Sequence, residues 1–380
     1  MSRIDDLTGN KRKSAESTWA HFGPYYAMFP LSFALNTINR YSDKGDIILD
    51  PFAGRFTSIY SGAVLNRRGI GIEINPVGWL FGYAKMHPAS EEEVLLRLKD
   101  IYNKRVYYKQ KALNMPEFYH YCFCDDVLKF LLSARKNLNW KKNQIDSTLM
   151  AFLLVHLHGN KGQSLSNQMK ITKSMGMDYS ISWWKKNGMS VPPEINPYEY
   201  IKERIKWRYK FGTPIVGDNL IILGDSTKEL EKISNDLKKR GERVSLLFTS
   251  PPYCSITDYH ADQWLRLWLL GGDEKYVYSK DKYKGRFKDQ DEYYVLLDDV
   301  FSKCKHMMSD DAVVYVRTDA RKYTLETTIE ILKKHFSDYS FFKRINVLKA
   351  KNTSQTLLYG NKTSKAAEVD IIMKRQKKQE

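Results

Sequence analysis

One short stretch of the chain, residues 246–253, combines residue types that could hold an amine. Apolar, strand-forming residues stop at Ser250, and Pro251, Pro252 and Tyr253 follow. Each proline fixes φ at about −65°, lacks an N–H and keeps the residue before it out of the helical region. The Ser250 hydroxyl and a neighbouring carbonyl could therefore accept hydrogen bonds from a planar amine while the Tyr253 ring stacks on it. An ordinary turn at a strand end is the alternative, and the rest of the chain has to decide between the two.

Acidic side chains follow three other apolar segments. Asp50 ends the first segment and precedes a turn that contains Gly54, Glu73 ends the second, and Asp225 follows the third. Ligands of open α/β sheets bind at the carboxyl ends of the strands. Asp50 then favours a cationic group such as an α-amine, and Glu73, about twenty residues past the turn, suits a ribose diol. Taken alone, Glu73 also fits a surface carboxylate, and Asp225 fits a helix N-cap as well as a contact with a bound purine.

Several common site signatures are absent from the sequence. It contains no Gly-x-Gly-x-x-Gly dinucleotide fingerprint and no Gly-Lys-Ser/Thr phosphate loop. Its four cysteines lack paired C-x-x-C spacing, so we expect no zinc or other metal site and no disulfide framework. We interpret Cys254, His156 and His158 as packing residues.

The charge of the chain indicates a polyanionic partner. The 380 residues include 61 Lys and Arg against 44 Asp and Glu, which gives a formal net charge of +17. Nucleic acid is the simplest partner for such an excess, because basic groups release the counterions that phosphates hold. The first residues do not resemble a signal peptide, and no apolar run approaches the ~20 residues of a membrane span. We therefore expect a cytoplasmic protein that makes no contact with membranes.

Seven apolar segments bounded by turn residues are typical of strands. They are 46–50, 70–74, 220–225, 244–249, 312–317, 341–348 and 369–374. Helical periodicity after the early strands predicts crossover helices and a parallel sheet. A long polar segment joins the last two strands, so we expect that pair to be antiparallel. The predicted class is α/β, with a seven-stranded, mostly parallel sheet.

A helical insertion interrupts this alternation. Helical spacing of apolar residues recurs at 91–110, 118–139, 147–159 and 201–212. We predict a core formed by 1–87 and 216–380, and an insertion, 88–215, as the candidate DNA-recognition region. Residues 1–20 are expected to form a loose polar arm.

The polar loop 159–197 within the insertion is the best candidate for contact with DNA. Its candidate contacts have basic, amide or indole side chains: Lys161, Asn167, Gln168, Lys170, Trp183 and Trp184. The amides could read adenine edges and the indoles could stack on bases or wedge between them. The alternative is that the lysines are merely solvated and the tryptophans belong to the core. The segment 349–365 is a second candidate at the same rim.

These residues resemble the motifs of amino-group DNA methyltransferases that use S-adenosylmethionine. In that family Asp-Pro-Phe-x-Gly-x-Gly-Thr binds the cofactor, and Ser/Asp/Asn-Pro-Pro-Tyr binds the target amine. Residues 50–57 match the first motif except that Phe56 replaces its second glycine, and residues 250–253 match the second in full. The resemblance covers about 22–87 and 216–376 and implies a Rossmann-like methyltransferase fold.

The resemblance also implies roles for individual residues. Asp50 and Phe52 would lie near the methionine part of the cofactor, Glu73 at the ribose and Asp225 near the adenine. The implied cofactor contacts are Tyr26, Phe29, Asp50, Pro51, Phe52, Gly54, Thr57, Glu73 and Asp225. The implied catalytic residues are Ser250, Pro251, Pro252 and Tyr253.

The implied activity is methylation of an exocyclic amine on a base that has left double-stranded DNA. Within the family a serine at the first position is more often associated with cytosine N4, so Ser250 favours that atom. Adenine N6 and RNA are the alternatives. The expected setting is restriction–modification or a related defence system, with a cognate restriction endonuclease or defence subunit as candidate partner. Phe56 leaves open a different class of protein, a DNA-binding recognition subunit with a weakened cofactor pocket.

Overall fold

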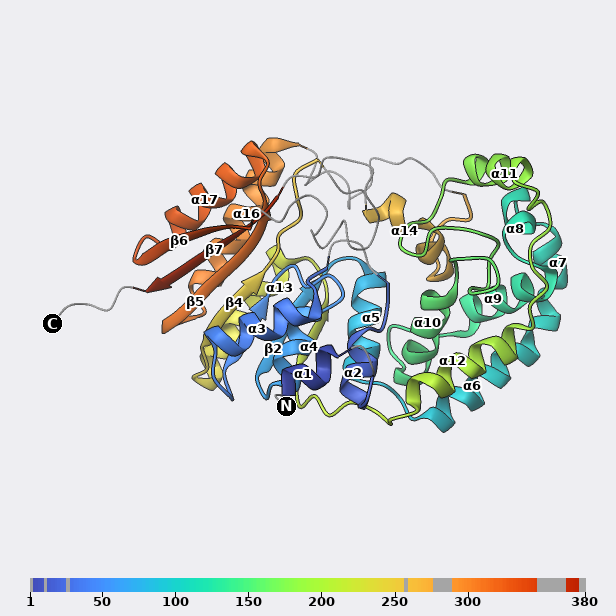
Figure 1. Cartoon of the computed structure of the whole chain (residues 1–380), viewed down its shortest axis with the longest axis horizontal. Coiled ribbons are helices and arrows are strands. Elements are labelled where there is room, and N and C mark those ends of the chain that lie inside the picture. Colours follow the sequence, from blue (N-terminus) through green and yellow to red (C-terminus); the bar gives the residue numbers. More distant parts are fainter. Residues whose placement is uncertain are drawn as a thin grey trace.

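The chain forms an α/β lobe and an adjoining helical lobe (Figure 1). The computed structural model describes residues 3–9, 12–24, 28–255, 259–275, 289–346 and 367–375. None of the helices in these ranges combines the length and apolar character that a transmembrane span requires.

The α/β lobe is built on one seven-stranded sheet in the order β3-β2-β1-β4-β5-β7-β6. The strands are β1 Ile47–Asp50, β2 Arg68–Glu73, β3 Leu220–Leu223, β4 Val244–Thr249, β5 Met308–Asp319, β6 Tyr339–Asn346 and β7 Glu368–Arg375. The first five pair in parallel, whereas β7 runs antiparallel to both β5 and β6. The predicted strands and the antiparallel last pair are confirmed.

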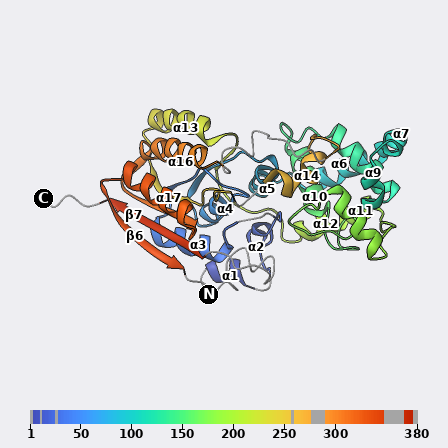
Figure 2. The ribbon, with the colours of Figure 1, turned by 90° about the horizontal axis from the view of Figure 1, so that it is seen from above.

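Helices cover both faces of this sheet (Figure 2). On one face lie α3 Leu31–Tyr41, α4 Thr57–Val64 and α5 Pro76–Met86, and on the other lie α13 Ser226–Arg240, α16 Gln290–Lys305 and α17 Lys322–His335. Every residue of β1 is buried. Burial from both sides explains why this central strand is a continuous apolar run rather than an alternating one.

The helical lobe contains most of the predicted insertion. Its elements are α6 Glu91–Lys104, the 3-10 turn η1 Arg105–Tyr108, α7 Lys109–Leu113, α8 Glu117–Cys122, α9 Asp125–Asn137, α10 Gln144–His156, α11 Met177–Lys186 and α12 Pro197–Tyr209. Two predicted helices are each broken into shorter ones, and the predicted loop 159–197 contains the helix α11. The interruption between α8 and α9 falls at Phe123 and Cys124, which have extended backbones.

The N-terminal segment is ordered onto the fold, so the prediction of a loose arm was wrong. It forms α1 Arg3–Thr8 and α2 Ala15–Ala20, and Ser14 caps α2 by accepting a hydrogen bond from the Ser17 N–H. Trp19 is fully buried against Phe152 and Tyr209 of the helical lobe. Burial of this single large side chain holds the segment on the fold even though the residues around it are polar.

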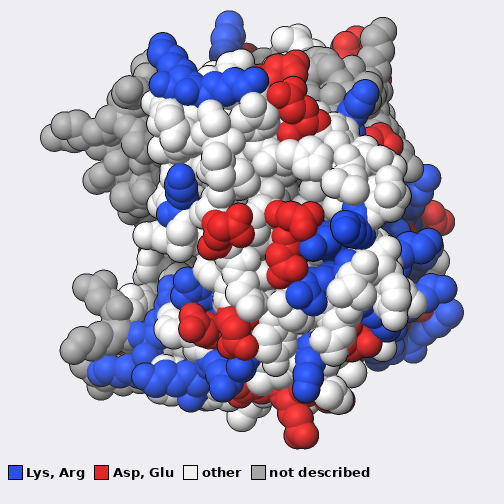
Figure 3. Space-filling model, turned by 90° about the vertical axis from the view of Figure 1, so that its right-hand side faces the viewer, with Lys and Arg blue, Asp and Glu red and all other residues white. Residues whose placement is uncertain are grey.

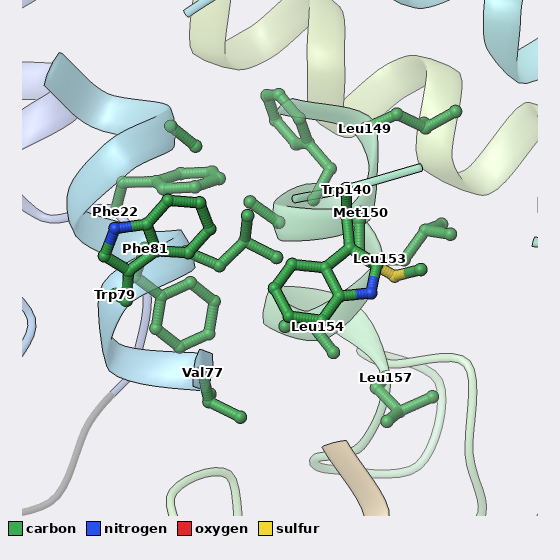
Figure 4. Packing of buried hydrophobic residues seen from close by; sticks show 14 of the residues in the cluster. Phe22, Val77, Trp79, Phe81, Trp140, Leu149, Met150, Leu153, Leu154 and Leu157 are labelled. Atoms are coloured by element: carbon green, nitrogen blue, oxygen red, sulfur yellow. The ribbon is translucent and has the colours of Figure 1, made fainter. Parts of the chain in front are cut away.

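One hydrophobic core runs through both lobes. Figure 4 shows Trp79 and Phe81 of α5 facing Met150 and Leu153 of α10, with Trp140 beside them. The rings of Trp79 and Trp140 have centroids 6.1 Å apart. Because α5 also packs on the sheet, this shared core fixes the helical lobe relative to the strands.

A further helix, α14 Tyr259–Leu269, lies in the helical lobe although the sequence analysis assigned its residues to the core. The Trp268 ring lies 4.7 Å from that of Tyr119, and Trp264 lies 5.1 Å from Phe118. The helical lobe is therefore made from two separate stretches of chain. The predicted helical insertion 88–215 therefore packs against a helix from the predicted core, and its role as a DNA-recognition region stays a prediction.

Candidate active site

A cavity opens at the carboxyl ends of β1 and β4. It brings together seven of the predicted site residues, which come from stretches far apart in the sequence: Phe29, Asp50, Phe52, Gly54, Thr57, Ser250 and Tyr253. Met28, Ala53, Arg55, Arg317 and Glu368 complete its lining. The two motifs singled out from the sequence therefore share one space.

Asp50 braces the two central strands at the floor of this cavity. Its Oδ1 accepts hydrogen bonds from Thr249 Oγ1 at 2.6 Å and from the Phe52 N–H at 3.1 Å, and its Oδ2 accepts from the Ser58 hydroxyl. Burial raises the pKa of Asp50 to about 6, although these three donors favour the charged form. The carboxylate thus holds the turn after β1 against β4, a role beyond the predicted attraction of a cation.

Glu73 closes the same turn from β2. Its Oε2 accepts from the Gly54 N–H at 2.8 Å, and its Oε1 accepts from the Asn75 N–H at 2.7 Å. Burial raises the pKa of Glu73 to about 8, against the effect of these backbone donors. Gly54 itself has a φ of 55°, in the left-handed region where a side chain is disfavoured. The carboxylate predicted to meet a ribose is therefore adjacent to the cavity wall.

Phe56, the departure from the family motif, turns away from the cavity. It caps α4 with a left-handed φ of 62°, and its ring is fully buried. The ring lies against Gly71 of β2 and Gly82 of α5, and a Cβ on either glycine would come within 2.7 Å of it. Gly71 and Gly82, which are distant from Phe56 in the sequence, thus leave the space that this ring fills. The ring does not crowd the turn that follows β1.

Buried cations fix the backbone of the same turn. Arg55 Nη1 donates to the Gly23 carbonyl at 2.8 Å, and Lys85 Nζ donates to the Arg55 carbonyl at 2.5 Å. Burial lowers the pKa of Arg55 to about 10 and also lowers the pKa of Lys85. Arg55 Nε further donates to Thr57 Oγ1 at 3.3 Å, which ties this predicted contact to the turn.

Asp225 acts as the N-cap of α13. Its Oδ1 accepts from the Thr227 N–H at 3.0 Å and from the Thr227 hydroxyl at 2.8 Å. Ser226, next in the chain, donates its hydroxyl to the Pro51 carbonyl. Of the two alternatives for Asp225, the local geometry shows the cap, and this residue does not line the cavity described above.

The amine-binding motif follows β4 directly. Pro251 is buried, and Pro252 and Tyr253 are partly exposed. The hydroxyl of Tyr253 is hydrogen-bonded to the Ser250 side chain, and burial together with the negative charge of Glu368 raises its pKa. The predicted cofactor contact Tyr26 lies outside the described residues.

Arg317 and Glu368 are cavity residues that the sequence analysis did not find. Arg317 ends the apolar part of β5, and Glu368 begins β7. A charged residue at the end of a strand was the signal available, and the sequence analysis used it for Asp50, Glu73 and Asp225 only. Arg317 pairs with Glu368 at 3.3 Å and with Asp370 at 2.7 Å, and all three side chains are buried.

Two of the proposed DNA contacts have structural roles instead. Asn167 is fully buried, and its amide donates to the carbonyls of Tyr121 and Met189 at 3.1 and 2.7 Å. Trp184 is also fully buried, and its indole N–H donates to the Gln168 carbonyl at 2.7 Å. Neither side chain can reach a base in this conformation, so we withdraw both from the candidate DNA contacts.

The other candidates in this loop are accessible to different degrees. Lys161 and Lys170 are exposed, and Trp183 is half-buried. Gln168 Oε1 accepts from the Lys161 N–H at 2.8 Å, which braces the loop. The second candidate segment, 349–365, lies outside the described residues.

Charge on the end face of the helical lobe is mixed. Figure 3 shows acidic and basic side chains interspersed on this face, with neither sign covering it. A DNA-binding surface is expected to be a continuous basic patch. This end face therefore lacks the electrostatic character of a DNA-binding surface.

Comparisons with known proteins agree with the motifs. A family model described as DNA methylase (N6_N4_Mtase) matches residues 3–77. The type II methyltransferase M.BsoBI of Geobacillus stearothermophilus is 25% identical over 303 residues, which is 72% of this chain and 56% of that protein. The type II methyltransferase M.MjaII of Methanocaldococcus jannaschii is 23% identical over 397 residues, or 83% of this chain and 74% of that protein. The chain thus spans little more than half the length of the first relative.

Two solved structures show only a weak likeness. The rRNA methyltransferase aviRa of Streptomyces viridochromogenes has a TM-score of 0.33 at 12% identity, covering 98% of this chain and 96% of that one. The precorrin-6y C5,15-methyltransferase of Geobacter metallireducens has the same TM-score at 10% identity, with coverages of 92% and 95%.

The fold and the cavity indicate the class of protein, and the sequence matches agree with it. A seven-stranded sheet with five parallel strands, an antiparallel last strand and a cavity at the carboxyl ends of β1 and β4 is a Rossmann-like methyltransferase fold. The family model over residues 3–77 and both type II methyltransferases agree with the resemblance of the motifs to DNA amino-methyltransferases.

Proposed function

We propose that this protein transfers a methyl group from S-adenosylmethionine to an exocyclic amine of a base in double-stranded DNA. The observation that carries the proposal is that Ser250 and Tyr253 line the same cavity as Asp50, Phe52 and Gly54. A site for amine and a site for cofactor must be adjacent if a methyl group is to pass directly between them.

The residues around the turn after β1 fit this cofactor. Asp50 and Glu73 supply carboxylates at the ends of neighbouring strands, and the left-handed Gly54 keeps the wall between them free of a side chain. Carboxylates suit the cationic and hydroxyl groups of S-adenosylmethionine. When bound, the cofactor supplies an electrophilic methyl group on a positively charged sulfur.

The chain's own contribution is to hold and activate the amine. Hydrogen bonds from the amine to the Ser250 hydroxyl and the Pro251 carbonyl would pull the nitrogen out of conjugation with its ring, which frees the lone pair. Tyr253 would stack on the base once it has left the duplex. No cysteine nucleophile is required, and Cys254 is buried.

We further propose cytosine N4 as the target atom. Support comes from Ser250, since serine at this position resembles the cytosine-specific members of the family. Adenine N6 is the second candidate, and RNA the third. We also propose a role in restriction–modification, with a cognate endonuclease or defence subunit as partner, because both relatives are type II methyltransferases.

The position of Phe56 bears on the alternative that the protein is a DNA-binding recognition subunit without methyltransferase activity. Because its ring packs between Gly71 and Gly82, it leaves the cavity clear. This favours an active enzyme over a protein with a weakened pocket.

The test is transfer of labelled methyl to amplified, unmethylated DNA, followed by identification of the modified nucleoside. N4-methylcytosine is the expected product, and N6-methyladenine would keep the enzyme but overturn the assignment from Ser250. Tyr253→Ala should lower kcat/KM by roughly 5- to 150-fold, the loss of ~1–3 kcal/mol of stacking. Tyr253→Phe keeps the ring and serves as the matched control. Absence of both cofactor binding and methyl transfer would support the recognition subunit.

A further inference from the structure

Two charged residues of the cavity belong to neither motif. In the antiparallel pair of β5 and β7, Arg317 lies opposite Asp370 and Asp319 lies opposite Glu368. Residues two apart on a strand point to the same face. Four charged side chains therefore gather on one face where β5 ends and β7 begins, and two of them, Arg317 and Glu368, line the cavity with Ser250.

The Arg317 guanidinium is held rigidly. Its Nε and Nη2 donate to the two carboxylate oxygens of Asp370 at 2.7 and 3.0 Å, a bidentate arrangement. The guanidinium carbon lies 3.4 Å from the centre of the Phe33 ring. Because its position and orientation are fixed in this way, the Arg317 guanidinium can orient one more side chain by hydrogen bonding.

The side chain that Arg317 orients is Glu368. Arg317 Nη1 donates to Glu368 Oε2 at 3.3 Å, and both side chains are less than a tenth exposed. A neighbouring guanidinium favours the ionised form of a carboxyl group. Glu368 lines the cavity together with Ser250 and Tyr253, which places the carboxylate at the amine-binding side of the cavity.

The reaction needs negative charge at this point. Methyl transfer forms a bond between nitrogen and carbon while the bond between carbon and sulfur breaks, so the positive charge moves from sulfur to the amine. The nitrogen must then lose a proton. Ser250 accepts a hydrogen bond but is neutral, and a serine hydroxyl is a poor acceptor for a proton. A fixed carboxylate whose side chain is less than a tenth exposed interacts strongly with such a charge.

We propose that Glu368 is a catalytic residue of this reaction: its carboxylate stabilises the amine as it becomes cationic and then takes its proton. The electron pair of the broken N–H bond returns to nitrogen, and Glu368 passes the proton to water. Arg317 is a positioning residue that orients Glu368. This inference rests on the proposed methyl transfer.

Single-turnover transfer to amplified, unmethylated DNA tests the assignment in three variants. Glu368→Gln should slow the methyl-transfer step by about 100-fold, at the low end of what a general base contributes. Glu368→Asp keeps the charge and should retain more activity than the glutamine variant. Glu242→Gln removes a carboxylate that pairs with Arg68 at 2.6 Å in the same lobe, outside the cavity, and should leave the rate unchanged.

Two further measurements separate catalysis from folding. The dissociation constant for S-adenosylmethionine and the melting temperature should stay close to native in Glu368→Gln. Adding Ser250→Asp to that variant puts a carboxylate back beside the amine and should restore part of the rate.

Several outcomes would overturn the assignment. A native rate in Glu368→Gln removes the catalytic role while the methyltransferase stands. Equal losses of rate and melting temperature in the Gln and Asp variants would indicate a structural role. No transfer by the native chain would remove both the proposed function and this inference.

Discussion

The strand-end cavity and the loop between α10 and α11 both contain polar side chains, but these side chains point to different partners. Ser250, Arg317 and Glu368 line one cavity, and they come from the end of β4, from β5 and from the start of β7. In the loop, Asn167 and Trp184 direct their donors to backbone carbonyls of the same lobe. Sheet geometry leaves polar groups available at the ends of strands, whereas an irregular loop needs its polar groups to satisfy its own backbone.

This difference also decides which residues are replaceable. A cavity-facing side chain on which no buried group depends can be changed with little effect on folding. A side chain that satisfies buried backbone groups cannot, because its removal leaves those groups without partners. The predictions below test this distinction, beginning with the largest expected effect.

Phe56→Ala should cost about 3–5 kcal/mol of the free energy of unfolding, because it empties the slot between Gly71 and Gly82. Phe56→Gly should be the more stable of the two variants, because the φ of 62° favours glycine. Chemical denaturation of both variants measures this. Gly82→Ala, which clashes with the native ring, should be tolerated better once Phe56 is glycine. A ring exposed in the cavity would instead make Phe56→Ala nearly neutral.

Asn167→Ala should cost about 2–4 kcal/mol, because two buried carbonyls lose their donors. Gln168→Ala is the matched control: its amide bonds to Asn160 and to the Lys161 N–H in a more exposed setting, and its loss should cost less than about 1 kcal/mol. Thermal unfolding compares the two. If Asn167→Ala left stability intact and weakened only DNA binding, our reassignment of this residue would be wrong.

Glu73 should make the protein less stable as the pH rises. Its pKa is raised from 4.5 to about 8 in the folded state, so the folded chain keeps a proton that the unfolded chain has already lost. The free energy of unfolding should therefore fall between about pH 4.5 and 8 and level off above. Asp50, with a pKa of about 6, adds to the fall only at the lower end. Denaturation in a pH series should show a flatter profile between pH 6 and 8 for Glu73→Gln.

The exposed lysines of the loop should affect DNA affinity alone. If Lys161 and Lys170 each contact a phosphate, replacing both by glutamine should lower the slope of log affinity against log salt by about 2. Fluorescence anisotropy with duplex DNA over a salt series gives this slope. The melting temperature should not change. Replacement of Lys129, which pairs with Asp125 at 2.7 Å on α9, is a control that should leave the slope as it is.

The sequence predicted the sheet and most of the cavity because both depend on local patterns. Apolar segments followed by Asp50, Glu73 and Ser250 located the strand ends, and parallel pairing brought those ends together. Arg317 and Glu368 were missed because their meeting depends on the register between β5 and β7, which no single segment contains.

Elements fixed by distant packing were predicted less well. The N-terminal residues look polar, and only the contacts of Trp19 with Phe152 and Tyr209 make them part of the fold. The type of a residue such as Asn167 suggested a base contact, but type alone does not reveal burial. The membership of α14 in the helical lobe was likewise invisible in a linear pattern.

The position of α14 limits how the helical lobe could be exchanged between proteins. The side chain of Arg266 is fully buried and donates to the carbonyls of Leu154 and Ile171, which joins α14 to α10 and to the loop that follows it. Residues 88–215 cut out alone would leave an unfilled hole where Trp264 and Trp268 now sit. A transplant of the helical lobe must therefore include α14 as well. The lobe is thus tied through one continuous stretch of chain to the motif that contains Ser250 and Tyr253.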